Sequence, residues 1–160
     1  MNVVAVDRAN YYQLKLADIQ VCAVVRKEHP LANKDNITLD DFLTYSFIKV
    51  IIPEFNEHHQ KDQQILAALG RERKIVFETS NGSCALQSLS CTDYIMLGAK
   101  GPANQMYEQM GLTTIAVPKE LSAPKFSMKF IWHQRQNLPA EHVWFRKLLL
   151  NELTASQNSQ

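Results

Sequence analysis

Histidines are the side chains of this chain best suited to metal binding, and their spacing does not favour a metal site. His58 and His59 are adjacent, so on a helix they point in different directions and cannot hold one ion together. His58 and Asp62 share a helical face, but in so polar a stretch that spacing is typical of a solvated pair. No partner at ligand spacing accompanies the remaining histidines, His29, His133 and His142. We therefore predict no metal and no other cofactor.

The three cysteines are too scattered to form a disulfide framework. Cys22 lies in an apolar stretch, where a thiol behaves as a small hydrophobic side chain. Cys84 and Cys91 are seven residues apart on a predicted helix, which places them roughly 10 Å apart along its axis. A disulfide needs Cα atoms within about 7 Å. The sequence therefore favours structural cysteines over a redox switch.

The motifs of hydrolases and nucleotide-binding proteins do not occur in the sequence. Gly-x-Ser-x-Gly is missing, and Ser83-Cys84 has no neighbouring base that the sequence identifies. Asn81-Gly82 and the stretch 98–101 (Gly-Ala-Lys-Gly) do not have the glycine spacing of a phosphate-binding loop. We therefore do not predict an enzyme.

A small polar cluster between a predicted strand and a predicted helix is the strongest candidate site. Thr79, Ser80 and Asn81 occupy this turn, and the free backbone N–H groups at a helix N-terminus favour an anion or a carboxylate. Ser80 or Asn81 is also well suited to cap the helix. Capping does not exclude ligand binding, because a capped turn keeps unused donors. Both roles stay open.

A regular alternation of strands and helices positions these residues. Apolar runs predict strands over residues 19–25, 47–52, 74–79, 94–97, 113–117 and 126–132. Helical patterns separate them, and the last helix begins at Pro139. The unbroken apolar strands predict an α/β fold with a mainly parallel sheet and helices on both faces. Such sheets bind ligands beyond the C-terminal ends of their strands, which here are residues 53–56, 79–82 and 98–100.

The connector between the first strand and the first helix is strongly polar. Thr38-Leu39-Asp40-Asp41 matches a capping box, and Phe42 follows on the apolar face of the helix. We interpret the charged residues before this box as a solvated connector and His29 as structural.

Composition excludes several function classes. The 160 residues carry 17 basic and 16 acidic side chains, so no broad basic surface for nucleic acid is expected. The longest apolar runs are far shorter than the roughly 20 residues that cross a bilayer. The N-terminus is not typical of a signal peptide. We expect a cytoplasmic location and no membrane partner.

Two longer segments resemble one known family. Residues 21–48, VCAVVRKEHPLANKDNITLDDFLTYSFI, resemble the strand, His-Pro-Leu-Ala, spacer and short-helix pattern in effector domains of LysR-type transcriptional regulators. Residues 130–153, FIWHQRQNLPAEHVWFRKLLLNEL, resemble the closing Trp-His-x-Arg strand and Trp-x-Arg helix of part of that family. The matching residues are 132–135 in the strand and 144–146 in the helix, and the combined pattern covers most of the chain at matching distances.

The resemblance implies a periplasmic-binding-protein-like (type 2) fold of two α/β subdomains with an effector cleft between them. Residues 1–17 would end subdomain I, residues 18–125 would form subdomain II, and residues 126–160 would return to subdomain I with its closing strand and helix. The DNA-binding winged helix-turn-helix and the first part of subdomain I are not in the sequence, which resembles an N-terminally truncated member. An exposed apolar patch around Trp132, Trp144 and Leu148 is then expected.

The resemblance also implies an effector-binding set, which coincides with the strand ends chosen above. By position it comprises Pro53, Phe55, Thr79, Ser80, Asn81, Gly98 and Met128. Peroxide-sensing members carry a reactive cysteine just after the strand matching 47–52, whereas residues 53–56 here contain none. The Trp-His-x-Arg ending resembles the branch that responds to aromatic or flavonoid inducers.

We therefore predict the effector-sensing and oligomerising domain of a LysR-type regulator. Its partners would be a small-molecule effector, such as a carboxylate or an aromatic compound, and further copies in a homodimer or homotetramer, with DNA bound only through the absent N-terminal domain. The alternative is a stand-alone solute-binding module without a DNA role, and a small α/β enzyme is the third hypothesis. A helix-turn-helix encoded upstream would separate the first two, and turnover lost on replacing Ser80 and Asn81 would favour the third.

Overall fold

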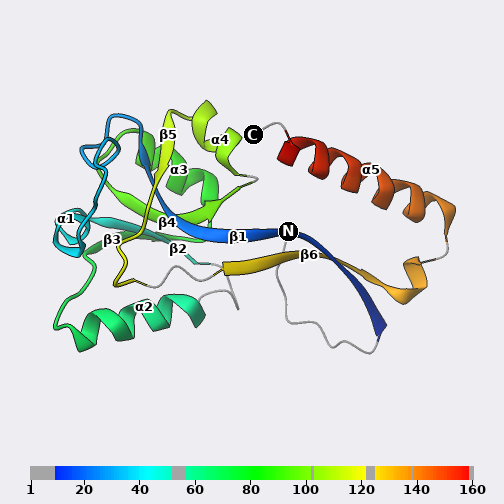
Figure 1. Ribbon diagram of the computed structural model, residues 1–160, viewed down its shortest axis with the longest axis horizontal. Helices are drawn as coiled ribbons and strands as arrows, with labels where there is room; N and C mark the ends of the chain where they lie inside the picture. Colours follow the sequence, from blue (N-terminus) through cyan, green and yellow to red (C-terminus); the bar gives the residue numbers. More distant parts are fainter. Residues whose placement is uncertain (1–9, 52–56, 102, 122–124, 138, 159–160) are drawn as a thin grey trace. The chain divides into compact units, whose positions relative to one another are not determined.

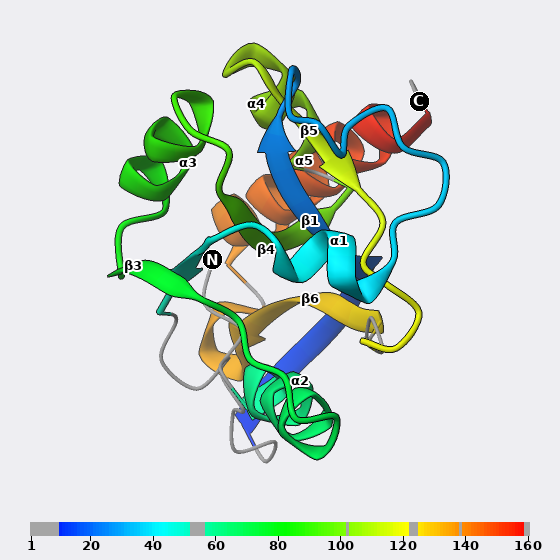
Figure 2. The same ribbon diagram turned by 90° about the vertical axis from the view of Figure 1, so that its left-hand side faces the viewer.

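The computed structural model divides the chain into two compact units (Figures 1 and 2). It describes residues 10–51, 57–101, 103–121, 125–137 and 139–158. Unit 1 consists of residues 1–19 and 125–160, and unit 2 consists of residues 20–124. The first strand, β1 (Tyr11–Arg26), belongs to unit 1 up to Ile19 and to unit 2 from Gln20 onward.

The sheet of unit 2 has the strand order β3–β2–β4–β1–β5. Its other strands are β2 (Phe47–Val50), β3 (Ile75–Thr79), β4 (Ile95–Lys100) and β5 (Leu112–Ile115). β2 pairs in parallel with β3 and β4, whereas β1 pairs antiparallel with β4 and β5. Strands β2 to β5 therefore point in one direction, and β1 runs against them. The predicted α/β fold is confirmed, with one reversed strand in the sheet.

Helices cover both faces of this sheet (Figures 1 and 2). Helices α1 (Leu39–Leu43) and α2 (Glu57–Ala68) contribute Phe42 and Leu66 to the core on one face. Helices α3 (Gly82–Ser90) and α4 (Asn104–Gln109) contribute Leu89 and Tyr107 to the core on the other face. The two cores are separate clusters, as expected when a sheet is covered on both sides.

The second half of β1 is a continuous apolar run because its side chains are buried on both faces of the sheet. Successive side chains of a strand point to opposite faces. Cys22 and Val24 accordingly join the core under α3 and α4, while Ala23 and Val25 join the core under α1 and α2. All four are buried. The prediction of a strand buried on both faces is confirmed.

Some element bounds differ from the sequence prediction. β1 begins at Tyr11 instead of residue 19, because its first half pairs with β6 (Lys125–His133), a partner more than a hundred residues away in the chain. β4 extends to Lys100, since β1 supplies pairing partners as far as Gln20. Helix α2 is described from Glu57 onward, and residues 52–56 lie outside the described part of the chain.

The predicted capping box of α1 is present. The Thr38 hydroxyl accepts the Asp41 N–H at 3.2 Å, and the Asp41 carboxylate accepts the Thr38 N–H at 3.0 Å. The Asp41 carboxylate also lies 2.7 Å from the Lys34 ammonium. The hydrogen bonds from Lys34 and Thr38 lower the pKa of Asp41 to about 2. The capping box thus fixes where this short helix begins.

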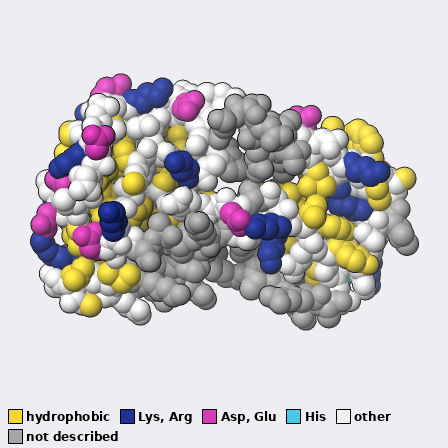
Figure 3. All heavy atoms as spheres, in the orientation of Figure 1, with side chains coloured by type: hydrophobic (Ala, Val, Ile, Leu, Met, Phe, Trp, Pro, Cys, Tyr) yellow, Lys and Arg dark blue, Asp and Glu magenta, His cyan; other side chains and the backbone are white. Residues whose placement is uncertain are grey.

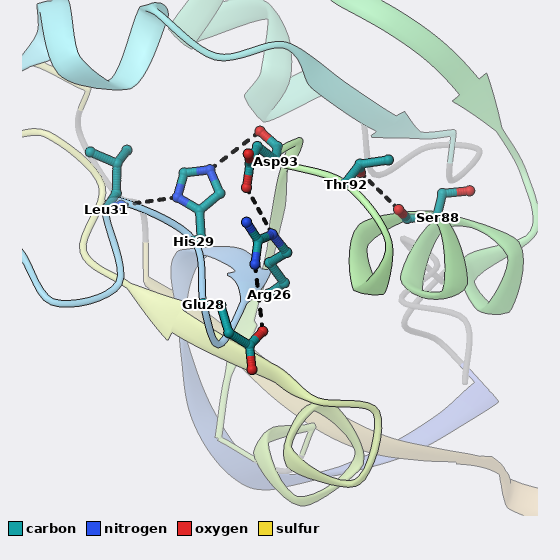
Figure 4. A network of polar contacts seen from close by, with 7 residues as sticks. All are labelled: Arg26, Glu28, His29, Leu31, Ser88, Thr92 and Asp93. Atoms are coloured by element: carbon teal, nitrogen blue, oxygen red, sulfur yellow. Dashed lines mark hydrogen bonds and ion pairs between the residues drawn. The ribbon is translucent and has the colours of Figure 1, made fainter.

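His29 is a buried structural residue, as predicted, and it joins three segments of unit 2 (Figure 4). Its Nδ1 accepts the Leu31 N–H at 3.1 Å, so its Nε2–H is the donor to the Asp93 carbonyl at 3.3 Å. The Asp93 carboxylate in turn accepts from Arg26 Nε at 2.8 Å. The ring also lies 4.5 Å, centroid to centroid, from Tyr45. This arrangement requires the neutral imidazole, because Nδ1 must keep its lone pair.

The state of His29 gives a pH dependence with a defined sign. Burial lowers the pKa of His29 below its ordinary 6.5, and the Asp93 carbonyl and carboxylate only partly oppose this. The unfolded chain therefore binds the proton first as the pH falls. We expect the free energy of unfolding to lose the His29 contribution progressively below about pH 6.5. Urea unfolding at pH 7.5 and 5.5 measures this loss.

His29→Asn is the matched variant, since its amide oxygen can still accept the Leu31 N–H but does not titrate. Its free energy of unfolding should change less between the two pH values than that of the wild type. An equal change in both proteins would show that other groups cause the dependence.

In unit 1, the residues of the Trp-His-x-Arg and Trp-x-Arg motifs join β6 to α5 (Ala140–Asn158). Arg146 on α5 donates to the Gln136 carbonyl at 2.6 Å and to the Asn137 carbonyl at 3.0 Å. Its guanidinium also lies 4.9 Å from the centre of the Trp132 ring. The Trp132 indole N–H donates to the Asn137 side chain at 3.2 Å. These motif residues thus close unit 1 structurally, and an arginine is suited to this site because its planar fork serves two carbonyls while stacking on a ring.

Helix α5 carries a group of exposed apolar side chains. Trp144 is 64% exposed, Phe145 49% and Leu148 41%, and hydrophobic side chains gather on the face of unit 1 shown in Figure 3. Two of the three residues predicted for an apolar patch are therefore exposed. Trp132 is instead half-buried, because the Tyr12 ring stacks on it and the Arg146 guanidinium lies over its ring.

Candidate functional site

The common direction of β2, β3 and β4 brings their C-terminal ends to one edge of the sheet. Val50 at the end of β2 pairs with Thr79 at the end of β3. The pairing of β2 with β4 ends at Ile48 and Met96, two residues before Gly98. Thr79 and Gly98 therefore lie at the same edge, on either side of β2. We call this edge, with residues 79–83 and 98–99, the strand-end site.

The turn after β3 is held by its own polar side chains. The Thr79 hydroxyl accepts the Asn81 N–H at 3.0 Å, and the Asn81 side-chain oxygen accepts the Cys84 N–H at 3.2 Å. Asn81 is the N-cap of α3, so the capping role predicted for Ser80 or Asn81 belongs to Asn81. Both side-chain oxygens are engaged within the turn, which makes it a rigid platform.

The same turn keeps several hydrogen-bond donors available. The Gly82 and Ser83 N–H groups are at the first two positions of α3, where no intrahelical acceptor exists. The Ser80 side chain is exposed and has no hydrogen-bond partner within the described part of the chain. The side-chain amide N–H groups of Asn81 can also donate. The turn can therefore bind a hydrogen-bond acceptor or an anion, while its side chains include no titratable acid or base for catalysis.

Gly98 is required for the packing of unit 2 at the end of β4. A Cβ atom placed on Gly98 would lie 2.7 Å from the Val24 Cγ2 atom and 2.9 Å from the Tyr107 hydroxyl oxygen. Both distances are too short for real atoms, so packing inside unit 2 requires glycine here. This requirement is independent of any ligand and gives Gly98 a structural role that the sequence prediction did not include.

The remaining residues of the predicted set lie outside the described part of unit 2. Pro53 and Phe55 lie outside the described residues. Met128 is half-buried on β6 and belongs to unit 1, whereas the strand-end site belongs to unit 2. Their place in the effector-binding set stays a prediction.

Tyr107 is the residue at this edge that the sequence prediction missed. It lies on α4, in a different element from the strand ends, and its hydroxyl reaches β4 beside Gly98. No local pattern marks it, because the contact depends on α4 folding back over β4. A small residue at a strand end opposite a large residue on a later helix is the only signal, and it is visible only once the pairing is known.

The thiol and acidic groups near this edge do not indicate redox or metal chemistry. Burial raises the pKa of the Cys22 thiol to about 11, against the opposing effect of Lys100, so the thiol stays protonated. Cys84 and Cys91 are free thiols on the surface. Glu78 forms an ion pair with Lys49 at 2.9 Å. Among the residues that the structure describes, no group of three His, Cys, Asp or Glu side chains could hold a metal ion.

Two surface hollows of unit 2 lie at other places. One of about 540 Å³ is lined by α2 and by the segment Gly70–Arg73. Another of about 330 Å³ lies between the loop after β1 and the end of β5. Neither is lined by residues of the strand-end site.

A comparison with known families identifies the fold around this site. The sequence profile of the LysR substrate binding domain matches residues 4–154. The chain belongs to the LysR substrate-binding domain family. LysR substrate-binding domains are the effector-sensing regulatory domains of LysR-type transcriptional regulators, with the type 2 periplasmic-binding-protein fold. The family and the fold predicted from the sequence are confirmed.

Solved structures support the fold of this LysR substrate-binding domain. A transcriptional regulator from Vibrio parahaemolyticus is 22% identical, with a TM-score of 0.69 over 94% of this chain and 68% of that chain. The regulatory domain of MexT, a transcriptional activator in Pseudomonas aeruginosa, is 19% identical, with a TM-score of 0.68 over 89% of this chain and 67% of that one. The effector-binding domain of QuiR, solved with shikimate, is 16% identical, with a TM-score of 0.62 over 95% of this chain and 69% of that chain.

Longer LysR-family structures are matched over a smaller share of their length. The chain spans 51% of HinK, a LysR family transcriptional regulator from Pseudomonas aeruginosa, with a TM-score of 0.67 and 14% identity. Within the described residues of this LysR substrate-binding domain, no helix combines the length and the apolar character needed to cross a membrane.

Proposed function

We propose that this chain binds a small-molecule effector at the strand-end site and thereby regulates a LysR-type transcription factor. The observation that carries the proposal is the turn after β3, which keeps the Gly82 and Ser83 N–H groups and the Ser80 hydroxyl available while Thr79 and Asn81 hold it rigid. Such a turn recognises an acceptor group with little loss of conformational freedom. The full proposed set is the one predicted from the sequence: Pro53, Phe55, Thr79, Ser80, Asn81, Gly98 and Met128.

The proposed effector is a small carboxylate, with an aromatic compound as the second class. Backbone N–H groups at a helix N-terminus favour negative charge, and α3 provides two of them beside a hydroxyl donor. The QuiR domain was solved with shikimate, which is itself a carboxylate. That complex supports the proposed class without identifying the effector of this chain.

In the regulator, effector binding would act by population shift. An effector that binds one arrangement of the protein more tightly moves the equilibrium toward it, and this would change how the oligomer holds DNA. We propose a cytoplasmic homodimer or homotetramer in which residues 1–17 and 126–160 are part of subdomain I and residues 18–125 form subdomain II. DNA contact would be made by a winged helix-turn-helix outside these 160 residues. An enzymatic activity is not proposed.

A thermal-shift experiment tests the strand-end site. A panel of small carboxylates that includes shikimate and benzoate is added to the protein, and we expect at least one member to raise the midpoint of thermal unfolding. A ligand at one hundred times its Kd stabilises by about 2.7 kcal/mol, which corresponds to roughly 5–10 °C for a chain of this size. Thr79→Val and Ser80→Ala should each weaken binding about tenfold. Ser80→Ala removes a hydrogen bond to the ligand, and Thr79→Val removes the hydrogen bond from the Asn81 N–H that holds the turn beneath the ligand.

Ser90→Ala is the matched control, since Ser90 lies at the other end of α3 and bonds only locally, to the Gln87 carbonyl and near Cys91. It should keep the full shift. If Thr79→Val and Ser80→Ala also keep the full shift, the effector binds elsewhere.

A further inference from the structure

Tyr107 carries a polar group into an otherwise apolar core. The residue is only 5% exposed, and its cluster consists of aliphatic side chains, Met96 and the Cys22 thiol. Its ring spans from α4 to the end of β4, where the missing side chain of Gly98 leaves room for the hydroxyl. Leucine or phenylalanine would fill an apolar core without bringing an oxygen to this position.

The hydrogen bonds of this hydroxyl are incomplete. Its oxygen lies close enough to the Ala99 N–H for that donor to favour the charged form, so this contact can use only a lone pair of the group. Within the described part of the chain, the structure gives its O–H proton no acceptor. Nearly all buried polar groups in proteins are paired, and a buried donor without a partner destabilises the fold. A group that carries such a cost needs a partner from outside the described core.

The position of the hydroxyl indicates where that partner would lie. The pairing between β2 and β4 stops at Ile48 and Met96, so among the residues that the structure describes the β4 backbone from Gly98 onward has no partner strand on that side. The hydroxyl contacts β4 at this unpaired point, at the same edge as the turn after β3. Burial raises the pKa of Tyr107, so the group stays a protonated donor at physiological pH.

We propose that the Tyr107 hydroxyl is a hydrogen-bond donor to the bound effector, which presents an acceptor oxygen of a carboxylate or carbonyl group at the end of β4. The assignment rests on the proposed effector-binding function of the strand-end site. It adds a ligand-binding residue from α4 to a site otherwise built from strand ends. In the competing structural role, the phenol would only fill the space beside Gly98, and its hydroxyl would be dispensable for binding.

Tyr107→Phe separates the two roles, because it removes the hydroxyl and keeps the ring. The probe is the member of the carboxylate panel that binds the wild type most tightly, and its Kd is measured by isothermal titration calorimetry. We expect the variant to bind it at least tenfold more weakly. The midpoint of thermal unfolding without ligand should change little, since the variant loses the Ala99 contact and an unsatisfied donor together.

Tyr94→Phe is the matched control. Tyr94 packs against the same core and directly precedes β4, at the opposite end of the strand from Gly98. The Kd of this variant should be that of the wild type. The amide resonance of Ala99 in an ¹⁵N spectrum should also shift on ligand addition in the wild type and shift less in Tyr107→Phe.

The possible results distinguish this inference from the proposed function. If a panel member binds the wild type and Tyr107→Phe equally well, the strand-end function stands and the assignment of Tyr107 is overturned. If no panel member binds the wild type, both are overturned. A Tyr107→Phe variant that is strongly destabilised without ligand yet keeps its Kd would establish the structural role alone.

Discussion

Replacing Phe42 by alanine is expected to lower the free energy of unfolding by about 3–5 kcal/mol. Phe42 is completely buried and packs at 5.2 Å, centroid to centroid, against the Phe47 ring in a T-shaped arrangement. Helix α1 has only five residues, so it cannot be stable without this anchor. The loss of the side chain would leave a cavity beneath α1 and release the helix from the sheet. Urea unfolding followed by far-ultraviolet circular dichroism measures the effect.

Leu69→Ala is the control for Phe42→Ala, because Leu69 is apolar but 53% exposed. Its free energy of unfolding should lie within about 0.5 kcal/mol of the wild type. A loss below about 1 kcal/mol in Phe42→Ala would mean that α1 contributes little to the core of unit 2.

Gly98→Ala is expected to cost about 1–3 kcal/mol through overpacking. The added Cβ would lie 2.7 Å from Val24 Cγ2 and 2.9 Å from the Tyr107 hydroxyl oxygen. Val24 is fully buried on β1, between β4 and β5, so it has no free space into which to move. Combining Gly98→Ala with Tyr107→Phe should recover part of the loss, because the hydroxyl contact disappears while the Val24 contact remains. A double-mutant cycle from urea unfolding gives this coupling energy.

Gly82→Ala provides the control for Gly98→Ala. A Cβ on Gly82 would meet no atom within 4 Å, and the residue is at the start of α3. Its stability should be equal to or slightly above that of the wild type, since alanine favours helix. Equal stability of Gly98→Ala and the wild type would mean that β4 can shift to admit a side chain.

Local sequence patterns were sufficient to predict the features that depend on residues close together in the chain. The capping box at Thr38 could be predicted because both of its hydrogen bonds join residues three apart. The double burial of residues 22–25 could be predicted because an unbroken apolar run suits a strand covered on both faces. Thr79 and Asn81 could be placed at a strand end and a helix start because they follow an apolar run and precede a helical pattern in the sequence.

Long-range pairing set the features that the sequence did not reveal. The first half of β1 carries apolar residues at every second position, Tyr12, Leu14 and Leu16. This alternation is typical of a half-buried strand, but the sequence prediction did not include it, and its partner, β6, lies more than a hundred residues away. The contact of Tyr107 with Gly98 depends on how α4 crosses β4. The reversed direction of β1 depends on its insertion between β4 and β5. Neither the contact of Tyr107 with Gly98 nor the direction of β1 leaves a periodic mark in the local sequence.

The position of β1 between β4 and β5 has a consequence for biosynthesis. Val24 pairs with Met96, about 70 residues later in the chain, and its other neighbour, β5, follows later still. At roughly 5–20 residues per second, several seconds pass between the synthesis of this apolar strand and that of its first partner. During that interval the segment Val21–Val25 has no sheet to join. We therefore expect this segment of the nascent chain to need a chaperone, because it can be buried only after β4 and β5 have been synthesised.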